Sequence, residues 1–282
     1  MIIVKLKGGL GNQLFQYAFG RLLSIKRNTS VKFDILSIDK RDIHRDFKLD
    51  RFNTKIELAS LEEIKKSEYS FGFISKIWMW TKRKILRIYN IGYSEKIVNS
   101  REKYYDGYWQ SYKYLEPIRK ELLREISLKE SINKKYSEFI SKINGSNSVS
   151  IHIRRGDYVN DPKTKKTHIT FGLEYYEEAI KIIKDKIKDP VFFVFSDDIS
   201  WVKENLKINY PIIFVSDPEI KDYEELIIMS VCKHNIIANS SFSFWGAWLN
   251  QNQGKTVIAP KKWSNLYQKE YKNICPENWV RI

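Results

Sequence analysis

The C-terminal half of the chain alternates short apolar segments with amphipathic ones, and this alternation is the strongest constraint on its fold. The apolar segments are Val149–Ile153, Val191–Phe195, Ile212–Val215, Asn235–Ala238 and Thr256–Ala259. Segments with helical spacing separate them, at Leu173–Ile187, Ile199–Leu206, Tyr223–Val231 and Phe242–Asn250. Short strands that are apolar on both faces are typical of a parallel sheet covered by helices on both sides. We therefore predict an α/β fold with a Rossmann-like parallel sheet in this half.

The N-terminal part begins with a second, shorter pattern of the same kind. A strand at Ile2–Leu6 precedes a glycine turn, a helix from about Gln13 to Lys26 and a strand at Val31–Ile35. Apolar residues at helical spacing mark the helix, and the order of elements is that of an α/β layer. We therefore expect two α/β domains within the 282 residues.

A polar break in the middle of the sequence indicates where the two domains meet. A long helical region at Leu115–Ile143 is followed by the polar stretch Asn144–Ser148. Polar and glycine-containing stretches of this kind separate periodic segments. We place the boundary there, with residues 1–146 in an N-terminal domain and residues 147–282 in a C-terminal domain.

Polar clusters follow the predicted strands of the C-terminal half, at the point where each strand ends. The clusters are Arg154–Tyr158, Ser196–Asp198, Ser216–Asp217, Asn239–Ser243 and Pro260–Trp263. The carboxyl ends of parallel strands meet at one edge of a sheet, and ligands of such folds bind outside that edge. The sequence therefore predicts a ligand site at the carboxyl edge of the C-terminal sheet.

The chemistry of these clusters suits a nucleoside diphosphate. Arg154 and Arg155 present planar forks that match phosphate oxygens bidentately. Asn239–Ser241 opens a helix, whose free N–H groups and hydroxyls favour an anion. Asp197 or Asp198 could accept hydrogen bonds from the N–H groups of a purine base.

Each cluster also has a structural interpretation that the sequence leaves open. The two arginines and Asp157 could form an ion-pair knot. The paired aspartates could cap a helix or bind a metal, and the two serines could be only a helix cap.

The overall charge allows several partners. The chain has 49 Lys and Arg against 34 Asp and Glu, a net charge of +15. Nucleic acid, an anionic membrane surface or a phosphorylated small molecule would each suit this charge.

The only cysteines, Cys232 and Cys275, form no Cys-x-x-Cys pair, which argues against a zinc cluster or a disulfide framework.

Two further features indicate a cytoplasmic protein. The first strand begins at Ile2, which leaves no room for a signal peptide, and no apolar run approaches about 18 residues.

The segment Ile74–Tyr89 combines two Trp residues with five basic ones. It fits either an interfacial helix on the inner face of the membrane or a helix packed on the core with a solvated basic edge.

Four motifs together resemble the α-1,2-fucosyltransferases of glycosyltransferase family 11. The motifs are Gly8–Tyr17, His152–Tyr158, Ser196–Asp198 and Asn239–Trp245. They occur in the order of the family and span most of the chain, and the His-x-Arg-Arg-Gly-Asp-Tyr motif is the most specific of them. One departure is conservative, since Phe244 stands where a Trp is often seen.

The resemblance implies a fold, an activity and a set of site residues. It implies a two-domain glycosyltransferase-B-like fold with the donor in the C-terminal domain. It implies inverting transfer of L-fucose from GDP-β-L-fucose to the 2-hydroxyl of a galactose-type acceptor, in the synthesis of a surface glycan or an oligosaccharide. No metal or other cofactor is expected.

The resemblance also carries roles onto matching positions of this chain. Arg155 would hold the diphosphate, Asp197 or Asp198 would face guanine, and Asn12 would lie near the fucose and the attacking hydroxyl. The predicted donor-binding residues are His152, Arg154, Arg155, Asp197, Asp198, Asn239, Ser240, Ser241 and Phe242. The predicted catalytic residues are Arg155, Asn12 and Asp157, of which Asp157 either removes the proton of the acceptor or orients an arginine.

Three alternatives remain at this point. A fucosyltransferase of different linkage would share all these motifs. A nicotinamide-dependent oxidoreductase could use Gly9 and Gly11, but Leu14 occupies the place of the third glycine in the dinucleotide motif. A basic nucleic-acid-binding protein would need a basic stripe and a recognisable module, and neither is visible.

Overall fold

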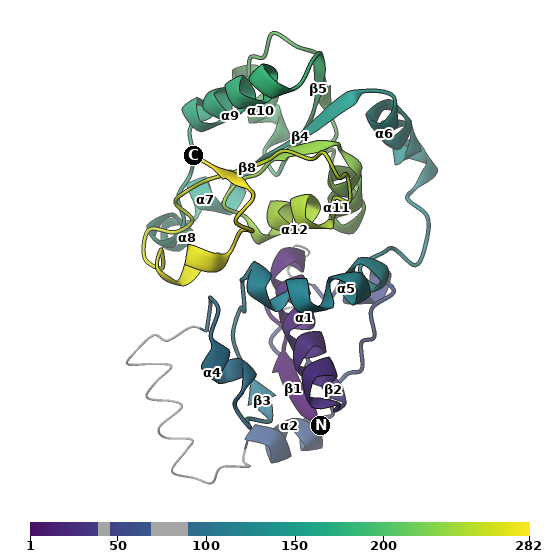
Figure 1. The fold of residues 1–282 in the computed structure, drawn as a ribbon, viewed down its shortest axis with the longest axis vertical. Helices are drawn as coiled ribbons and strands as arrows, with labels where there is room; N and C mark the ends of the chain where they lie inside the picture. The colour runs from purple at the N-terminus through teal and green to yellow at the C-terminus, as the bar shows by residue number, and fades with distance from the viewer. Residues whose placement is uncertain (39–45, 69–89) are drawn as a thin grey trace. The chain divides into compact units, whose positions relative to one another are not determined.

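A computed structural model describes residues 1–38, 46–68 and 90–282 (Figure 1). Their contacts divide the chain into two compact units, Met1–Lys129 with Glu270–Ile274, and Glu130–Lys269 with Cys275–Ile282. The basic segment Ile74–Tyr89 lies outside the described residues, so its membrane interpretation stays a prediction. Within the described ranges, no helix has both the length and the apolar character needed to cross a membrane.

The second unit is built on a six-stranded sheet in which every pair of neighbouring strands is parallel. The strands are β4 (Asn147–Ile153), β5 (Pro190–Ser196), β6 (Ile212–Phe214), β7 (His234–Ile236), β8 (Val257–Ala259) and β9 (Val280–Arg281). The first five match the apolar segments of the sequence, which confirms the predicted parallel α/β fold. The short strand β9 at the end of the chain was not predicted.

Helices cover both faces of this sheet (Figure 1). They are α6 (Lys134–Asn144), α9 (Leu173–Lys186), α10 (Ile199–Asn205), α11 (Asp222–Val231) and α12 (Ser241–Leu249), while the short helices α7 (Gly156–Asn160) and α8 (Pro162–Thr167) follow the carboxyl end of β4. Side chains alternate along β5, so Phe192 and Val194 pack with α9 and α10, whereas Phe193 and Phe195 pack with α6 and α11. Because both faces are buried, the strands are mainly apolar, as the sequence indicated.

The strand order of this sheet is β6-β5-β4-β7-β8-β9. The chain therefore starts at β4 in the middle, runs outward through β5 and β6, and returns to the other side of β4 at β7. Such a reversal leaves a crevice outside the carboxyl ends of the two central strands. The fold thus places a ligand site at the ends of β4 and β7.

The first unit has a smaller parallel sheet, in the order β2-β1-β3. Its strands are β1 (Ile2–Lys5), β2 (Val31–Asp34) and β3 (Tyr104–Tyr105). Its helices are α1 (Leu10–Arg27), α2 (Leu61–Glu68), α4 (Glu95–Val98) and α5 (Arg119–Glu125), with 3₁₀ turns η1 (Leu49–Arg51), η2 (Tyr112–Tyr114), η3 (Glu116–Ile118) and η4 (Glu270–Asn273). The predicted strand, turn, helix and strand are all present.

The continuous helix predicted over Leu115–Ile143 is wrong. The helix α5 ends at Glu125, and α6 begins only at Lys134, after the cap residue Asn133. Between them, the N–H of Asn53 donates to the Ser127 carbonyl (2.9 Å), and Phe52 and Leu128 form an antiparallel bridge. This pairing with a distant segment interrupts the helix, which local periodicity does not reveal.

The first unit gives way to the second between Lys129 and Glu130, which is earlier in the chain than the domain boundary predicted after residue 146. The difference is the helix α6, whose residues Tyr136 and Ile143 pack against Phe193 and Met229 of the second unit. The segment Glu270–Ile274 also belongs to the first unit by its contacts. Its link there includes the Ser111 hydroxyl, which donates to the Asn273 carbonyl at 2.6 Å.

A buried ion pair ties α1 to α5 in the first unit. The Arg21 guanidinium donates to both carboxylate oxygens of Glu125, at 2.9 and 2.8 Å. The Tyr17 hydroxyl donates to the same carboxylate at 2.6 Å, and the side chain of Glu125 is only 2% exposed. Burial opposes ionisation of Glu125, but these donors outweigh it and lower its pKa.

We predict that Glu125→Ala destabilises the fold by about 3–5 kcal/mol, because it leaves the charge of Arg21 buried without a partner. Urea unfolding followed by circular dichroism measures this loss. The control is Glu116→Ala, which removes an exposed carboxylate from a surface pair with Arg119 and should change stability by less than about 1 kcal/mol. Equal effects of the two substitutions would contradict the role of the buried pair.

Candidate active site

The carboxyl ends of β4 and β7 bring together the predicted site residues of the second unit. β4 pairs with β7 in parallel, with Ile151 opposite Ile236, so the segments after Ile153 and after Ala238 leave the sheet side by side. The Tyr158 hydroxyl donates to the Asn239 carbonyl at 3.1 Å. The arginine motif and the serine motif therefore lie together at one edge of the sheet, as the sequence predicted.

Arg154 is held on both branches of its guanidinium by carboxylates. Its Nη2 donates to Asp157 Oδ1 at 2.6 Å, and its Nη1 lies 3.0 Å from Asp197 Oδ2. Burial disfavours this charge, but the two carboxylates outweigh it and raise the pKa of Arg154. For Arg154 and Asp157, the structure therefore shows the ion-pair interpretation that the sequence left open.

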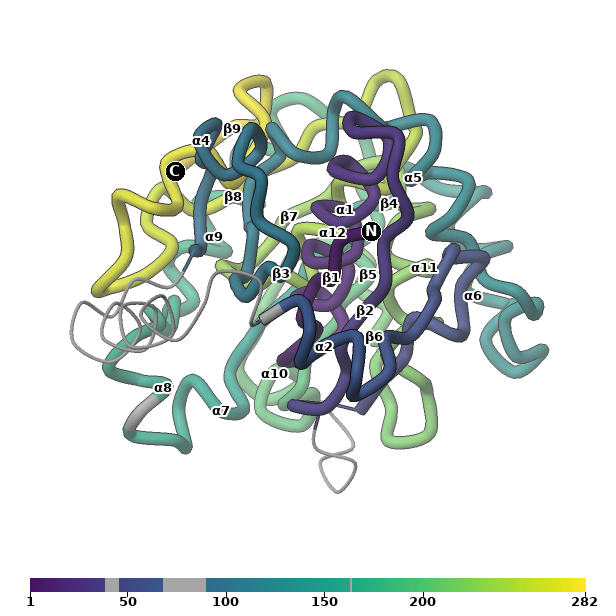
Figure 2. Tube along the Cα trace, turned by 90° about the horizontal axis from the view of Figure 1, so that it is seen from below, coloured from purple at the N-terminus to yellow at the C-terminus, as the bar shows by residue number. Residues whose placement is uncertain are grey.

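Gly156 allows this arrangement. A Cβ atom at Gly156 would collide with the carboxylate of Asp197. The glycine of the Arg-Arg-Gly-Asp motif thus lets Asp197 approach from the end of β5. From here the chain enters the short helices α7 and α8, which lie side by side (Figure 2).

Arg155 is held differently from Arg154. Its Nε donates to Asp198 Oδ2 at 3.2 Å, and its guanidinium lies 3.4 Å from the centre of the Trp201 ring. Its backbone N–H donates to Asp197 Oδ1 at 2.9 Å. Across residues 1–38, 46–68 and 90–282, no protein group pairs with the two terminal nitrogens of Arg155. The result is a fixed guanidinium whose outer fork, on a side chain 17% exposed, remains available to a ligand.

The two aspartates after β5 are engaged by the protein through both of their carboxylate oxygens. Asp197 accepts from Arg154 and from the backbone of Arg155, and Asp198 accepts from Arg155 and from the Trp201 N–H. Asp198 caps the helix α10, which confirms that one aspartate of the pair is an N-cap. Contact of either aspartate with guanine stays a prediction. In such a contact, the base would hydrogen-bond to carboxylate oxygens that already accept from Arg155.

Within the part of the chain that the structure describes, no three His, Cys, Asp or Glu side chains gather into a cluster. The metal interpretation of these aspartates stays a hypothesis from the sequence.

The serine motif forms the start of α12. The Ser240 side chain accepts from the Phe242 N–H at 3.3 Å, which confirms the helix cap. The Asn239 amide donates to the carbonyls of Ile169 and Trp263, at 3.0 Å each. Asn239 therefore fastens two loops beside the site, and its contact with a donor stays a prediction.

His152 lies beneath the site, near the end of β4. It is 4% exposed, and its ring centre is 5.6 Å from that of Phe242. Burial and, second, the charge of Arg154 lower the pKa of His152 to about 3, so the imidazole is neutral. Its Nδ1 atom has no hydrogen-bond partner among the described residues. A neutral, buried imidazole carries no charge toward a diphosphate, and the predicted contact of His152 with the donor stays a prediction.

The glycine turn of the first unit is fixed by internal hydrogen bonds. Gly8 has φ = 78°, a left-handed conformation that favours glycine. The Gln13 amide donates to the Gly8 and Asp46 carbonyls, at 3.0 and 2.7 Å, so it is used within the fold rather than offered to a ligand. Asn12 Oδ1 accepts from the Gln110 amide at 2.6 Å, which orients the Asn12 side chain.

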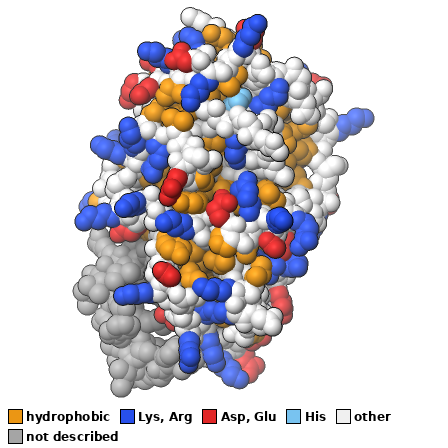
Figure 3. Space-filling model, in the orientation of Figure 1, with side chains coloured by type: hydrophobic (Ala, Val, Ile, Leu, Met, Phe, Trp, Pro, Cys, Tyr) orange, Lys and Arg blue, Asp and Glu red, His pale blue; other side chains and the backbone are white. Residues whose placement is uncertain are grey.

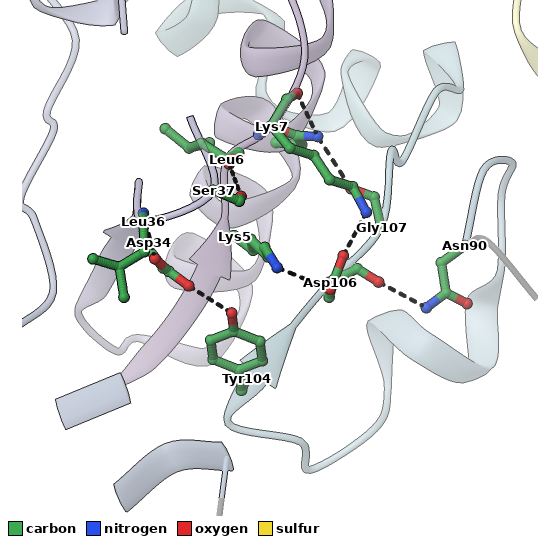
Figure 4. Close-up of polar contacts among 11 residues, drawn as sticks. Lys5, Leu6, Lys7, Asp34, Leu36, Ser37, Asn90, Tyr104, Asp106 and Gly107 are labelled. Atoms are coloured by element: carbon green, nitrogen blue, oxygen red, sulfur yellow. Dashed lines mark hydrogen bonds and ion pairs between the residues drawn. The ribbon is translucent and has the colours of Figure 1, made fainter. Parts of the chain in front are cut away.

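A second polar group lies at the carboxyl edge of the same small sheet (Figure 4). Asp106 accepts from Lys7 Nζ at 2.5 Å and lies 3.6 Å from Lys5 Nζ. The Tyr104 hydroxyl donates to Asp34 at 2.6 Å. Lys7 also lies 4.7 Å from the centre of the Tyr108 ring. These contacts fix the strand ends that flank the glycine turn.

Sequence reasoning missed Trp201. Its ring supports Arg155, and it lies in the first turn of α10, three residues after the cap residue Asp198. An aromatic residue so close to a capping aspartate at a strand end was the available signal. Only the fold shows that the ring meets an arginine that follows a different strand.

A parallel-sheet unit with an arginine fork at its strand ends suits a phosphorylated ligand. The model of the family "Glycosyl transferase family 11" matches residues 1–282, and the chain belongs to this family. It is therefore a glycosyltransferase, as the motifs indicated.

Curated relatives agree with the family. The chain is 37% identical, over 293 aligned residues, to an alpha-1,2-colitosyltransferase of Escherichia coli, with 100% of this chain and 99% of the relative covered. It is 28% identical over 153 residues to galactoside alpha-(1,2)-fucosyltransferase 2 of Gorilla gorilla gorilla, which covers 51% of this chain and 44% of that protein.

Solved structures support the fold. The fucosyltransferase NodZ from Bradyrhizobium superposes with a TM-score of 0.51 at 11% sequence identity, covering 87% of this chain and 92% of NodZ. At this identity the likeness concerns the fold alone. It confirms the glycosyltransferase-B-like architecture of two parallel-sheet units that the sequence predicted.

Proposed function

We propose that the protein is an inverting α-1,2-fucosyltransferase that moves L-fucose from GDP-β-L-fucose to the 2-hydroxyl of a galactose-type acceptor. The α-1,2 linkage is supported by the names of two relatives, one of which is a galactoside fucosyltransferase. The acceptor belongs to a surface glycan or an oligosaccharide.

The observation that carries the proposal is the free fork of Arg155. Two parallel N–H groups match two oxygens of a phosphate, and the group is already oriented by Asp198 and Trp201. The start of α12 lies at the neighbouring strand end and adds the favourable dipole of a helix N-terminus. A diphosphate placed there would meet positive potential from two neighbouring strand ends.

This arrangement suits the chemistry of the leaving group. Breaking the bond between fucose and phosphate builds positive character on the sugar and negative charge on the departing β-phosphate. The fork of Arg155 stabilises that developing charge without reorganising, because its position is fixed before the donor arrives. The donor phosphate is then bound more tightly in the transition state than in the ground state.

Inversion needs a single displacement, in which the acceptor hydroxyl attacks the face opposite the phosphate. A base would remove the hydroxyl proton. Asp157 is engaged by Arg154 at 2.6 Å, which favours the orienting role over the role of base. Asn12, oriented by Gln110, is the residue of the first unit that we assign to the sugar and the attacking hydroxyl.

A second candidate donor is GDP-colitose. The 37% identity to a colitosyltransferase extends over the whole chain. Colitose is L-fucose without its 3-hydroxyl group, so the diphosphate site would be the same for both donors. The difference would lie only in the groups that contact the sugar ring.

The protein is proposed to be cytoplasmic, with a peripheral membrane contact through Ile74–Tyr89. The two Trp residues and the basic side chains of this segment support the contact. Nucleic acid is not proposed as a partner. On the face shown in Figure 3, basic side chains are scattered among acidic and apolar ones and form no stripe.

We predict that the purified protein converts GDP-fucose and a galactose-terminated oligosaccharide into an α-1,2-linked product in the presence of EDTA. The arginine fork and the helix N-terminus supply the positive charge that a metal would otherwise provide. NMR of the product reads the linkage, and GDP-colitose is assayed in parallel. A different linkage, transfer from GDP-colitose alone, or activity that needs added Mn²⁺ would each contradict part of the proposal.

We predict that Arg155→Lys lowers turnover by about 10²–10³-fold, because an ammonium group cannot reproduce the two parallel donors. Its melting temperature should stay near that of the wild type, while the thermal stabilisation by GDP falls. Arg119→Lys, at a surface pair of the first unit, is the matched control and should behave like the wild type. A stable Arg155→Lys protein with turnover within a few-fold of wild type would remove the assignment.

A further inference from the structure

A chain of hydrogen bonds leads from the helix α11 toward Arg155. Ser216 follows β6 and is 9% exposed, and its hydroxyl donates to the carboxylate of Glu225 in the first part of α11. The oxygen of the same hydroxyl accepts the backbone N–H of Ser196 at 2.9 Å. Ser216 thus connects the carboxyl group of Glu225 to the last residue of β5.

The chain continues from β5 to the arginine. The Ser196 hydroxyl accepts the Asp198 N–H at 3.0 Å. The Asp198 carboxylate then accepts from Arg155 Nε at 3.2 Å. Each link fixes the next group, since a hydroxyl that accepts from a backbone N–H holds that strand end in place.

We propose that Glu225 is a positioning residue for the arginine fork, acting through Ser216, Ser196 and Asp198. Glu225 itself touches neither the donor nor the reacting atoms. It anchors Ser216, and so sets where the end of β5 presents Asp198 to Arg155. The part of this inference that concerns donor binding rests on the proposed function. The positioning of Arg155 by Glu225 is independent of it.

The ionisation of Glu225 makes the link measurable. Burial is the main cause that raises the pKa of this carboxyl to about 7; the Ser216 hydrogen bond opposes the rise, and the nearby charges of Asp222, Asp197 and Asp217 add to it. At pH values between the ordinary pKa of a carboxyl group and about 7, Glu225 therefore carries a proton in the folded protein but has lost it in the unfolded chain. Stability from this group is present at low pH and is lost as the pH rises through that window.

The surroundings of Glu225 are mainly acidic. The charged and titratable groups on the elements that surround it are Lys221, Asp222, Tyr223 and Glu224 at the start of α11, Asp217 and Glu219 after β6, Asp197 and Asp198 after β5, and Lys134, Lys135, Tyr136, Glu138 and Lys142 of α6. The facing helix α12 has no charged side chain. Lys135 is paired with Asp217 and Glu219, so it offsets those two carboxylates rather than Glu225.

An anionic donor bound at the fork would disfavour a second negative charge nearby, so donor binding should favour protonated Glu225. The phosphates of GDP-fucose are both esterified and do not titrate near neutral pH. Its affinity for the wild-type protein should therefore fall as the pH rises from 6 to 8. A rise of the Glu225 pKa from about 7 by half a unit to one unit corresponds to a fall of about 2.5-fold to fivefold over this pH range.

The variants separate positioning from charge. Glu225→Gln keeps an oxygen that accepts from Ser216 but cannot titrate, so it should bind GDP-fucose like the wild type at pH 6 and show no change up to pH 8. Glu225→Ala removes the anchor and should weaken binding by about tenfold, as loss of one partner of a buried hydrogen bond does. Glu219→Gln, an exposed residue of the same loop, controls for loss of one negative charge.

A second measurement needs no ligand. The NMR signal of the Arg155 Nε–H group, assigned with Arg155→Lys, should shift with an apparent pKa near 7 in the wild type and in Glu219→Gln. It should not shift in Glu225→Gln. In Ser216→Ala, which keeps the carboxyl group but breaks the chain, the shift should be largely lost.

The outcomes are distinct. An Arg155 signal that follows Glu225 in a protein that does not bind GDP-fucose would support the positioning and overturn the proposed donor. A signal that titrates equally in Glu225→Gln, or in Ser216→Ala, would overturn the positioning. So would a folded Glu225→Ala protein that binds GDP-fucose as tightly as Glu219→Gln.

Discussion

The candidate phosphate site depends on the contacts that hold the guanidinium of Arg155. A free arginine side chain has many rotamers, and ordering it on binding costs free energy that a preformed site avoids. Here Asp198 takes the inner nitrogen and Trp201 supports the flat face of the guanidinium. These contacts leave the outer fork as the part that can meet a ligand. The neighbouring Arg154 has the same side chain but is bound on both branches by carboxylates, so only one of the two arginines is suited to a phosphate.

These contacts exist because the sheet brings separate strand ends together. Arg155 follows β4, Asp198 and Trp201 follow β5, and the capped start of α12 follows β7. In the order β6-β5-β4-β7-β8-β9, both β5 and β7 are neighbours of β4. Helices bury both faces of the sheet, so the strand ends have little freedom to move apart. The rigid sheet thus supplies the precision that the charged groups need.

Much of the fold and part of the site could be predicted from the sequence. Strands such as Val191–Phe195 are apolar on both faces, so their position and parallel pairing follow from local pattern and short connections. The prediction failed at Leu115–Ile143, because Ser127 and Leu128 pair with residues more than 70 positions away. The different environments of Arg154 and Arg155 were also invisible, since adjacent residues of one type differ only in their tertiary partners. Trp201 and Glu225 were missed for the same reason.

A crystal structure of the protein with bound GDP addresses the assignment of Arg155 directly. The arrangement of the site predicts that the β-phosphate accepts two parallel hydrogen bonds from the terminal nitrogens of Arg155. It also predicts that Arg154 keeps its pairs with Asp157 and Asp197, and that Asp198 and Trp201 keep their contacts with Arg155. A diphosphate bound to Arg154 in place of its aspartates, or bound elsewhere with the fork of Arg155 unoccupied, would contradict the account.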